Sequence, residues 1–392
     1  MRILCVTGYY KPAYVYGGPV HSISGLCEGL AEAGAEVTVF TTDADGVGRH
    51  LDVPLGVPVN AGGVNVHYFK ALWPMARLWP FYSSALGRAC RASAAEYDAV
   101  YLVGSWAFTT WAGAHAAWDA GVPYVLSPRG SFMNWSMSQK PLKKRAYLAV
   151  FERRLNNRAA ALHLTTSLEE RQLRRWRFKP DRFIIPNGID LKKFVNLPER
   201  GGLRRKLGIS RNEAMSLFVG RLHKEKRIDL MIDAFAAGGT DLLGTHFVIA
   251  GPDEDGSGKL AEERVKKLGL SGRVHFLGLQ SGPDLMQAYA DADLLLLLST
   301  GESFGMAAVE AMAAGLPVIL SNGVGLCEEV LRAEAGFVVS PNLKDISSVW
   351  RQLIRDSEAR QRMAQNGQRL VRERFSLESV SKQMIDLFNS LA

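Results

Sequence analysis

The sequence predicts an α/β protein made of two doubly wound domains. Short apolar runs alternate with amphipathic stretches along nearly the whole chain, and Gly-containing joins separate them. The length of 392 residues suits two domains of ordinary size. A polar break from Lys192 to Gly202 is followed by a fresh strand, where the alternation begins again. We therefore expect two Rossmann-like domains that face a central cleft, because ligands of such sheets bind at the carboxyl ends of the strands.

The first domain is predicted to cover residues 1–190. An apolar run, a Gly-containing loop, a helical pattern and a second strand form a βαβ unit at its start. Its predicted strands are Ile3 to Val6, Glu36 to Thr41, Val64 to Phe69, Ala99 to Val103, Tyr124 to Ser127, Ala161 to Thr165 and Phe183 to Ile185. The first helix is expected from Val20 to Ala33.

The second domain is predicted to cover residues 191–375. Its expected strands are Ser216 to Val219, His246 to Ala250, Val274 to Leu277, Asp293 to Leu298 and Pro317 to Ser321. The expected helices are Ile228 to Ala236, Lys259 to Leu268, Asp284 to Ala290, Met306 to Ala314, Ile346 to Asp356 and Glu358 to Arg374. A final amphipathic helix at 376–392 is expected to pack back on the first domain.

Composition favours a folded cytoplasmic protein. Hydrophobic residues make up 47% and charged residues 22% of the chain, as in globular proteins. The four scattered cysteines suit neither a disulfide framework nor a zinc site, and the apolar N-terminus resembles a strand more than a signal peptide. Residues 99–118 carry no charge, but Gly104 and Ser105 interrupt them, which indicates a strand, a turn and a buried helix rather than a membrane span.

The most informative motif lies between Thr300 and Glu310. Five leucines predict a buried strand, and a Gly-containing loop then leads into a helix near Met306. Free N–H groups at such a helix start form an anion site suited to a diphosphate. Glu302 and Glu310 lie beside it, and carboxylates accept hydrogen bonds from neutral hydroxyls such as those of a sugar. Taken alone, the motif fits equally well a structural Glu near a helix N-terminus.

Two further segments support a phosphate-binding function. Gly220-Arg221-Leu-His-Lys-Glu-Lys226 follows another predicted strand, and an Arg for bidentate contact with a nearby Lys would neutralise a departing diphosphate. Gly17 and Gly18 join the first strand to the first helix, where paired glycines let a backbone approach a ligand closely.

With these segments and Ile185-Pro-Asn-Gly-Ile-Asp190, the chain resembles the retaining family 4 glycosyltransferases (glycosyl transferases group 1), which use nucleotide sugars and have the two-domain GT-B fold. The resemblance runs nearly end to end, and the Gly-Arg-Leu-x-x-x-Lys and Glu-seven-Glu motifs are its most specific parts. It implies a metal-independent hexosyltransferase without a cofactor. The donor would be a nucleoside diphosphate sugar, and the anomeric configuration would be retained in a front-face substitution.

The resemblance also implies roles for individual residues. Arg221 and Lys226 would hold the donor diphosphate, and Glu302 would bind hydroxyls of the transferred sugar, so these three are the predicted catalytic residues. Glu310 would bind the ribose. The other predicted donor-binding residues are Gly17, Gly18, Leu277 beside the base, and Ser303, Phe304, Gly305 and Met306 through their backbone amides.

One segment departs from the family pattern. Many members carry a His after a first-domain strand, whereas this chain has Ser127-Pro-Arg129-Gly-Ser131. An Arg does not act as a general base. We therefore assign Arg129, together with Asn187, to the acceptor side, where Arg129 would grip an anionic acceptor.

Metal and nucleic-acid partners are not expected. Two segments, Asp43-Ala-Asp45 and Asp291-Ala-Asp293, have the Asp-x-Asp spacing of manganese-dependent sugar transferases of another fold. Aspartates are also common in turns and next to strands, however. The formal charge of +8 comes from residues 129–182, which hold fourteen basic against four acidic groups. Because aromatics interrupt these basic stretches and no nucleic-acid motif accompanies them, we expect contact with an anionic membrane surface, the inner face of the plasma membrane, and a lipid-linked or oligosaccharide acceptor.

The same sequence pattern is compatible with other functions. A nucleotide-sugar epimerase or a phosphorylase of the same architecture, or a non-catalytic nucleotide-sugar-binding protein, would share much of this pattern. A dinucleotide-dependent oxidoreductase would need G-x-G-x-x-G after the first strand, and this chain lacks it.

Overall fold

The computed structural model describes residues 1–391, which form two compact units. One unit comprises Met1–Gly188 and the C-terminal segment from Leu377 onward, and the other comprises Ile189–Ser376. These limits lie within two residues of the expected boundaries at 190 and 375. Each unit contains one mainly parallel sheet with helices on both faces, which confirms the predicted α/β class with two Rossmann-like domains.

The first unit is built on an eight-stranded sheet with the order β3-β4-β2-β1-β5-β6-β7-β8. All neighbouring strands are parallel except β3 and β4, which form an antiparallel hairpin at one edge. The strands are β1 (Arg2–Val6), β2 (Glu36–Thr42), β3 (Pro58–Ala61), β4 (Val64–Phe69), β5 (Ala99–Val103), β6 (Tyr124–Ser127), β7 (Ala161–Leu164) and β8 (Asp181–Ile184).

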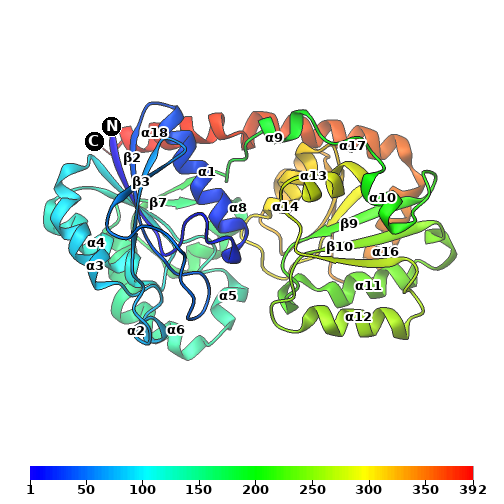
Figure 1. Ribbon diagram of the computed structural model, residues 1–392, viewed down its shortest axis with the longest axis horizontal. Helices are drawn as coiled ribbons and strands as arrows, with labels where there is room; N and C mark the ends of the chain where they lie inside the picture. The colour runs from blue at the N-terminus through cyan, green and yellow to red at the C-terminus, as the bar shows by residue number, and fades with distance from the viewer. Residues whose placement is uncertain (392) are drawn as a thin grey trace. The chain divides into compact units, whose positions relative to one another are not determined.

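Two cores cover the two faces of this sheet. Along β1, Leu4 and Val6 point into one core, and Ile3 and Cys5 point into the other, as the two-residue period of a strand requires. The first core packs under α3 (Ser84–Ser93) and α4 (Phe108–Ala120), and the second packs under α1 (Gly18–Glu32) and α18 (Leu377–Asn389). The C-terminal helix thus lies against α1 (Figure 1).

The other helical segments of this unit lie between the strands. They are α2 (Met75–Leu78), α5 (Asn134–Ser138), α6 (Pro141–Tyr147), α7 (Arg153–Arg158), α8 (Ser167–Leu173), η1 (Tyr14–Tyr16), η2 (Ala94–Glu96), η3 (Leu148–Glu152) and η4 (Arg174–Trp176). Helices α6 and α7 continue into each other through the wider turn of η3, since the residues at both junctions keep helical backbone angles.

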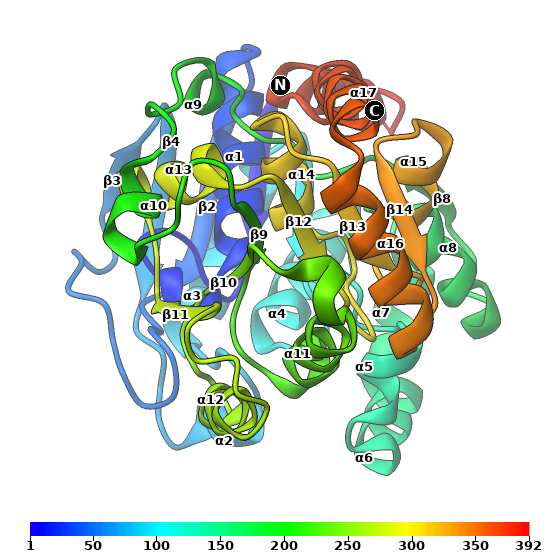
Figure 2. The same ribbon diagram turned by 90° about the vertical axis from the view of Figure 1, so that its right-hand side faces the viewer.

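The second unit has a six-stranded, fully parallel sheet. Its order is β11-β10-β9-β12-β13-β14, which can be followed across Figure 2. The strands are β9 (Ala214–Val219), β10 (Thr245–Ala250), β11 (Val274–Gly278), β12 (Leu294–Leu297), β13 (Val318–Ser321) and β14 (Gly336–Val339). Strands β12 and β13 are buried along their whole length, so they consist of continuous apolar residues rather than an alternating pattern.

Helices cover both faces of the second sheet (Figures 1 and 2). One face carries α11 (Ile228–Ala237), α12 (Ser257–Lys267) and α16 (Leu343–Arg355), and the other carries α13 (Gly282–Asp291), α14 (Met306–Ala313) and α17 (Ser357–Leu370). The remaining segments are α9 (Lys192–Val195), α10 (Gly202–Leu207), α15 (Cys327–Arg332), η5 (Lys224–Lys226), η6 (Gly239–Leu242) and η7 (Val371–Phe375).

The uncharged stretch 99–118 forms strand β5 and most of α4, both of which are buried in the first unit. Among residues 1–391, no helix has both the length and the apolar character needed to cross a bilayer. The four cysteines lie buried, each inside an ordinary helix or strand.

The first unit contains one buried acid that links two of its segments. Glu152, which is 1% exposed, accepts a hydrogen bond of 2.7 Å from the backbone N–H of Trp106 and another of 3.2 Å from Asn156. Trp106 follows β5 and adopts a left-handed backbone conformation with φ of 64°. Burial raises the pKa of Glu152 to about 7.

We predict that Glu152→Gln raises the stability of the protein at alkaline pH. An acid with a folded-state pKa near 7 stabilises the fold only while it is protonated, so stability falls as pH rises between about 4.5 and 7. Above pH 7 the charge costs about 3 kcal/mol. The glutamine keeps an acceptor for Trp106 but carries no charge.

The test is the melting temperature of both proteins at pH 5 and pH 8.5. Glu152→Gln should gain stability over the native protein at pH 8.5 and much less at pH 5, whereas Glu96→Gln, at an exposed position of the same unit, should change neither. An equal effect of Glu152→Gln at both pH values would show that the buried charge is not the cause.

Candidate functional site

The predicted donor-site residues of the second unit gather at the carboxyl ends of its central strands. Strands β9 and β10 are each followed directly by a glycine, Gly220 and Gly251, whose φ angles are both 154°. A Cβ atom on Gly251 would lie 1.8 Å from the carbonyl oxygen of Gly220, so the two loops can approach each other only because a side chain is absent. This contact brings the loop that carries Arg221 and Lys226 against the end of β10.

Backbone hydrogen bonds join the loops that follow β9, β12 and β13. The N–H of Thr300 donates to the carbonyl of Glu225 at 2.9 Å. Glu302 donates to the carbonyl of Gly323 at 3.0 Å and accepts from the N–H of Gly325 at 2.8 Å. The backbone of Glu302 is therefore held by two bonds to the loop after β13, independently of any ligand.

Lys226 and Glu302, predicted from separate motifs, form an ion pair between Lys226 Nζ and Glu302 Oε2. Their side chains are 13% and 23% exposed, so one edge of the pair remains open to solvent. A partly buried pair of this kind is screened less than a surface pair. It can offer a cation to a phosphate and an acceptor to a hydroxyl at the same point.

Arg221 also has an acidic partner, which the sequence did not indicate. Its guanidinium donates to Glu254 on the loop after β10, and both side chains are about two-fifths exposed. The two loops are in addition paired through their backbones, because Leu222 donates to the carbonyl of Pro252 at 2.8 Å. An exposed pair of this kind is weak, so an incoming anion can compete for Arg221.

The loop from Ser303 to Met306 leads into α14 as predicted. Gly305 has a φ of 108° and precedes the first turn of the helix, and its carbonyl accepts the N–H groups of Ala308 and Val309 at 2.9 and 3.3 Å. The N–H groups of Met306 and Ala307, at the very start of the helix, have no acceptor within it. The ring of Phe304 is 2% exposed and packs against Phe375, with 5.7 Å between ring centroids. The ring of Phe304 is therefore unavailable to a ligand.

Glu310 lies one turn further along α14. Its Oε2 accepts a hydrogen bond of 2.7 Å from the hydroxyl of Tyr289 on α13, a residue that no sequence motif indicated. Burial raises the pKa of Glu310, and the hydrogen bond from Tyr289 opposes that rise. Leu277, predicted beside the base, is partly buried near the end of the edge strand β11.

Glu225 is a further acid that the sequence did not single out. It lies next to Lys226 on η5, and burial raises the pKa of its carboxyl to about 7, while the charge of Lys226 acts in the opposite direction. Its carboxyl therefore titrates at neutral pH beside the predicted phosphate site. Perturbed carboxyls of this kind are common in functional sites.

In the first unit, Gly17 and Gly18 form the start of α1. Gly17 caps the helix with φ of 70° and ψ of −140°, a backbone conformation that favours glycine, and Gly18 is the first helical residue. The loop before them is fixed by Tyr16, whose hydroxyl accepts the N–H of Gly46 at 3.1 Å. Both glycines therefore lie at a helix start, and the predicted close approach of a ligand to their backbone stays a prediction.

Arg129 and Asn187, both predicted on the acceptor side, are hydrogen-bonded to each other. The guanidinium of Arg129 also donates to the hydroxyl of Tyr101 at 3.1 Å, and this hydroxyl lies 2.8 Å from Nδ1 of His163. Burial lowers the pKa of His163 to about 3, so the imidazole is neutral at physiological pH. Two of the five N–H donors of Arg129 are thus used inside the protein, and its Nε is buried without a hydrogen-bond partner among residues 1–391.

The two Asp-x-Asp segments have structural partners. Asp43 accepts the N–H of Ala71 at 2.7 Å and pairs with His50. Asp291 caps the start of α10, and Asp293 binds the buried Arg204 at 2.8 Å. Three of the four aspartates, Asp43, Asp291 and Asp293, therefore bind other segments of their own unit.

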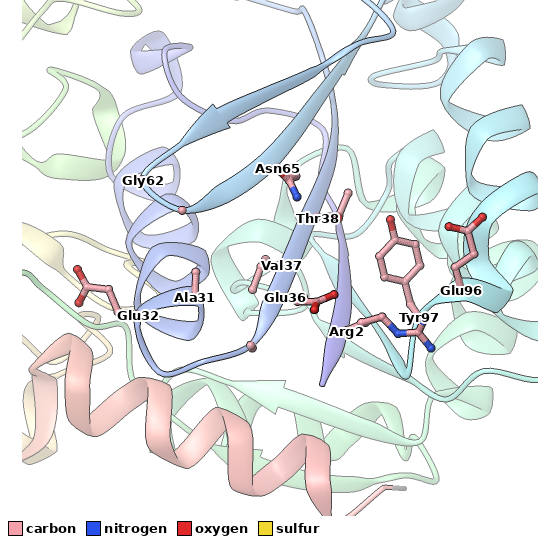
Figure 3. A pocket seen from close by; sticks show the side chains of 12 residues that line it. Arg2, Ala31, Glu32, Glu36, Val37, Thr38, Gly62, Asn65, Glu96 and Tyr97 are labelled. Carbon is pink, nitrogen blue, oxygen red and sulfur yellow. The ribbon is translucent and has the colours of Figure 1, made fainter.

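A cavity of about 670 Å³ lies elsewhere in the first unit (Figure 3). It is lined by residues at the amino ends of β1 and β2, among them Arg2 and Glu36, and by Tyr97. Ligands of parallel α/β sheets bind at the opposite, carboxyl edge. None of the predicted site residues lines this cavity.

Both halves of the chain match models of known protein families. Residues 200–370 match the model of the family described as glycosyl transferases group 1, and residues 17–188 match that of a glycosyl transferase 4-like domain. The chain is a glycosyltransferase with a group 1 domain in its second half. The match with the group 1 family contains Arg221, Lys226 and the whole segment from Glu302 to Glu310. The match with the 4-like domain contains Gly17, Arg129 and Asn187, among others.

Two curated relatives of this glycosyltransferase align with different shares of the chain. An uncharacterized glycosyltransferase of Methanocaldococcus jannaschii is 29% identical and aligns over 99% of this chain and 98% of its own length. A D-inositol 3-phosphate glycosyltransferase of Corynebacterium urealyticum is 32% identical over 218 residues, and the alignment covers 53% of this chain and 51% of the relative. The chain thus matches only about half the length of the latter protein.

Solved structures share the GT-B fold of this glycosyltransferase. Sucrose-phosphate synthase from Thermosynechococcus elongatus superposes with a TM-score of 0.80 at 23% identity, over 100% of this chain and 99% of that one. HepE (Alr3699) from Anabaena, solved in complex with UDP-glucose, has a TM-score of 0.75 at 23% identity, with both chains fully covered. At this identity the likeness establishes the fold alone.

We predict that Gly251→Ala destabilises the second unit by more than about 3 kcal/mol. The new methyl group would overlap the backbone of Gly220, which cannot move without breaking the pairing of β9 with β10. Gly256→Ala is the matched control, because Gly256 also has a positive φ but has no heavy atom within 4 Å of the position that a methyl group would take. It should cost only about 1 kcal/mol. Urea unfolding measures both changes, and equal losses would contradict the proposed contact.

Proposed function

We propose that the chain transfers a hexose-type sugar from a nucleoside diphosphate sugar to an acceptor hydroxyl, with retention of the anomeric configuration and without a metal ion. The observation that carries this proposal is the Lys226–Glu302 pair at the start of α14, with Arg221 on the same loop as Lys226. The group 1 family match supports it, and HepE, a protein of the same fold, binds UDP-glucose.

In this proposal the donor residues have separate tasks. Arg221 and Lys226 neutralise the diphosphate, and the backbone amides at the start of α14 bind its oxygens. Glu302 exchanges its contact with Lys226 for hydroxyls of the transferred sugar. The bond from the anomeric carbon to the diphosphate oxygen breaks, the acceptor oxygen bonds to that carbon on the same face, and the acceptor proton passes to the departing diphosphate. Stabilising that leaving group contributes most to the rate.

We further propose that the acceptor is lipid-linked, or an oligosaccharide, in bacterial surface polysaccharide assembly, and that the first unit binds the anionic inner face of the plasma membrane. The continuous helix from α6 to α7 supports this. Its residues Leu142, Ala146 and Val150 follow each other at intervals of four, and all three are exposed, Leu142 at 80% and Val150 at 66%. Lys143 and Arg145 flank this apolar stripe and are exposed as well. An exposed apolar stripe with basic flanks suits an anionic lipid surface.

We predict that Glu302→Gln lowers kcat at least about 100-fold, because the amide replaces a charged acceptor whose hydrogen bonds strengthen during the reaction. The protein is incubated with UDP, GDP and ADP sugars, and mass spectrometry identifies the donor that is used and the product that forms. NMR gives the anomeric configuration of that product. Affinity for the free nucleoside diphosphate should change less than about threefold, since it carries no sugar.

Two further variants complete this test. Arg221→Ala should weaken binding of the free nucleoside diphosphate as well, because it removes a phosphate contact. Glu262→Gln, at an exposed position on α12, should behave as the native protein. Turnover by Glu302→Gln at the native rate, or an inverted product, would contradict the proposed reaction.

We predict that Leu142→Glu weakens binding to vesicles with one-third anionic lipid roughly tenfold, by removing apolar contact and adding a like charge. Flotation at low salt measures this. Leu260→Glu is the control, because Leu260 is 67% exposed in the second unit. Native protein that stays in solution with these vesicles would refute the membrane proposal and leave the transfer reaction unaffected.

A further inference from the structure

Tyr289 is buried beside a residue that the proposed function assigns to the donor. Its side chain is fully buried within the core of the second unit, on α13, and its ring packs near that of Phe194 at 6.5 Å. Its hydroxyl reaches across to α14 and donates to Glu310 Oε2 at 2.7 Å. A phenol carries one proton to donate, and here the acceptor is a carboxylate, so the hydrogen bond is of the stronger, charge-assisted kind.

This contact determines what Glu310 can still bind. With Oε2 engaged and turned toward the core, the other carboxylate oxygen, Oε1, is left for a partner outside the protein. Glu310 remains partly exposed, and among residues 1–391 its side chain makes no other hydrogen bond. A carboxylate oxygen fixed in this way accepts from a neutral donor such as a hydroxyl, whereas a phosphate at the nearby start of α14 would be repelled.

We propose that Tyr289 is a positioning residue that fixes Glu310 for the ribose 2′-hydroxyl, and thereby makes the site selective for ribonucleotides over 2′-deoxyribonucleotides. This inference rests on the proposed use of a nucleoside diphosphate sugar. The selectivity follows because a donor that lacks the hydroxyl leaves a desolvated carboxylate oxygen without a partner. A carboxylate free to rotate would turn to solvent and lose that discrimination.

The electrostatic surroundings of Glu310 agree with this arrangement. Burial raises its pKa, while the hydrogen bond from Tyr289 and the charge of Lys193 on α9 favour the ionised form. Tyr289 in turn remains protonated, because burial and the adjacent carboxylate raise its pKa. The phenol is therefore the donor and the carboxylate the acceptor, a direction that leaves Oε1 available for a hydroxyl proton.

The test compares the affinities of UDP, GDP and ADP with those of their 2′-deoxy counterparts, measured by isothermal titration calorimetry on the full chain. The native protein should prefer the ribonucleotide of its own base at least tenfold. Tyr289→Phe keeps the ring and its packing, and the preference should fall to less than about threefold. KM for the nucleotide sugar should rise, and kcat should change less than about twofold, since the reacting atoms are not touched.

Two controls separate this role from a loss of stability. Tyr124→Phe removes another buried hydroxyl, one that donates to the carbonyl of Leu155 in the first unit, and it should keep the native preference. Glu310→Gln should lose the preference by itself, and adding Tyr289→Phe should cause no further loss, as expected for two residues that act as one unit.

The outcomes distinguish the two proposals. A native protein that binds none of the three nucleoside diphosphates would overturn the proposed function and this inference together. A native protein that binds one of them and discriminates, with Tyr289→Phe retaining the full preference, would overturn the role of Tyr289 alone. Additive losses in the double variant would also overturn it.

Discussion

The hydrogen bond from the N–H of Thr300 to the carbonyl of Glu225 is the contact on which the arrangement of the predicted donor-site residues depends. It joins the loop after β9 to the loop after β12, two strands that are neighbours in the sheet but far apart in sequence. Lys226 is next to one end of this bond and Glu302 is two residues from the other, so the ion pair follows from the backbone geometry. Because backbone atoms set this distance, the two side chains need little reorganisation to meet a ligand.

Charge balance in the donor site follows from the same arrangement. Each of the two predicted phosphate-binding cations has a carboxylate partner in this structure, Glu254 for Arg221 and Glu302 for Lys226. The exposed first pair is worth little and is screened by salt, while the partly buried second pair is stronger. A diphosphate would therefore displace Glu254 more readily than Glu302. Glu302 would then remain near the sugar end of the ligand, where its carboxylate meets hydroxyls rather than phosphates.

Most strands of both sheets were predictable because buried parallel strands are continuous apolar runs, and β4, β5 and β6 have the predicted bounds. Strand β3 was missed because it is an exposed hairpin edge whose residues alternate between exposed and half-buried. Strand β14 was missed as well, since it is a four-residue edge strand whose two middle residues are only half-buried. The motif residues of the second unit were predictable because Gly-ended strands and helix starts have sequence signals. Tyr289 and Glu254 had none, since a buried Tyr in a helix is typical of a core, and an acidic loop is typical of a solvated surface.

Arg129 shows why a residue type alone does not define a role. Its backbone has a φ of 52°, and the N–H of the next residue, Gly130, is held by the carboxylate of Glu169, which also accepts from Thr165 at 2.8 Å. The guanidinium is bonded to Tyr101 and Asn187. A cation fixed in this way cannot extend far toward an acceptor, but it places a positive charge at the carboxyl end of β6. The predicted contact with an anionic acceptor would therefore be made with a charge fixed in place rather than with a mobile side chain.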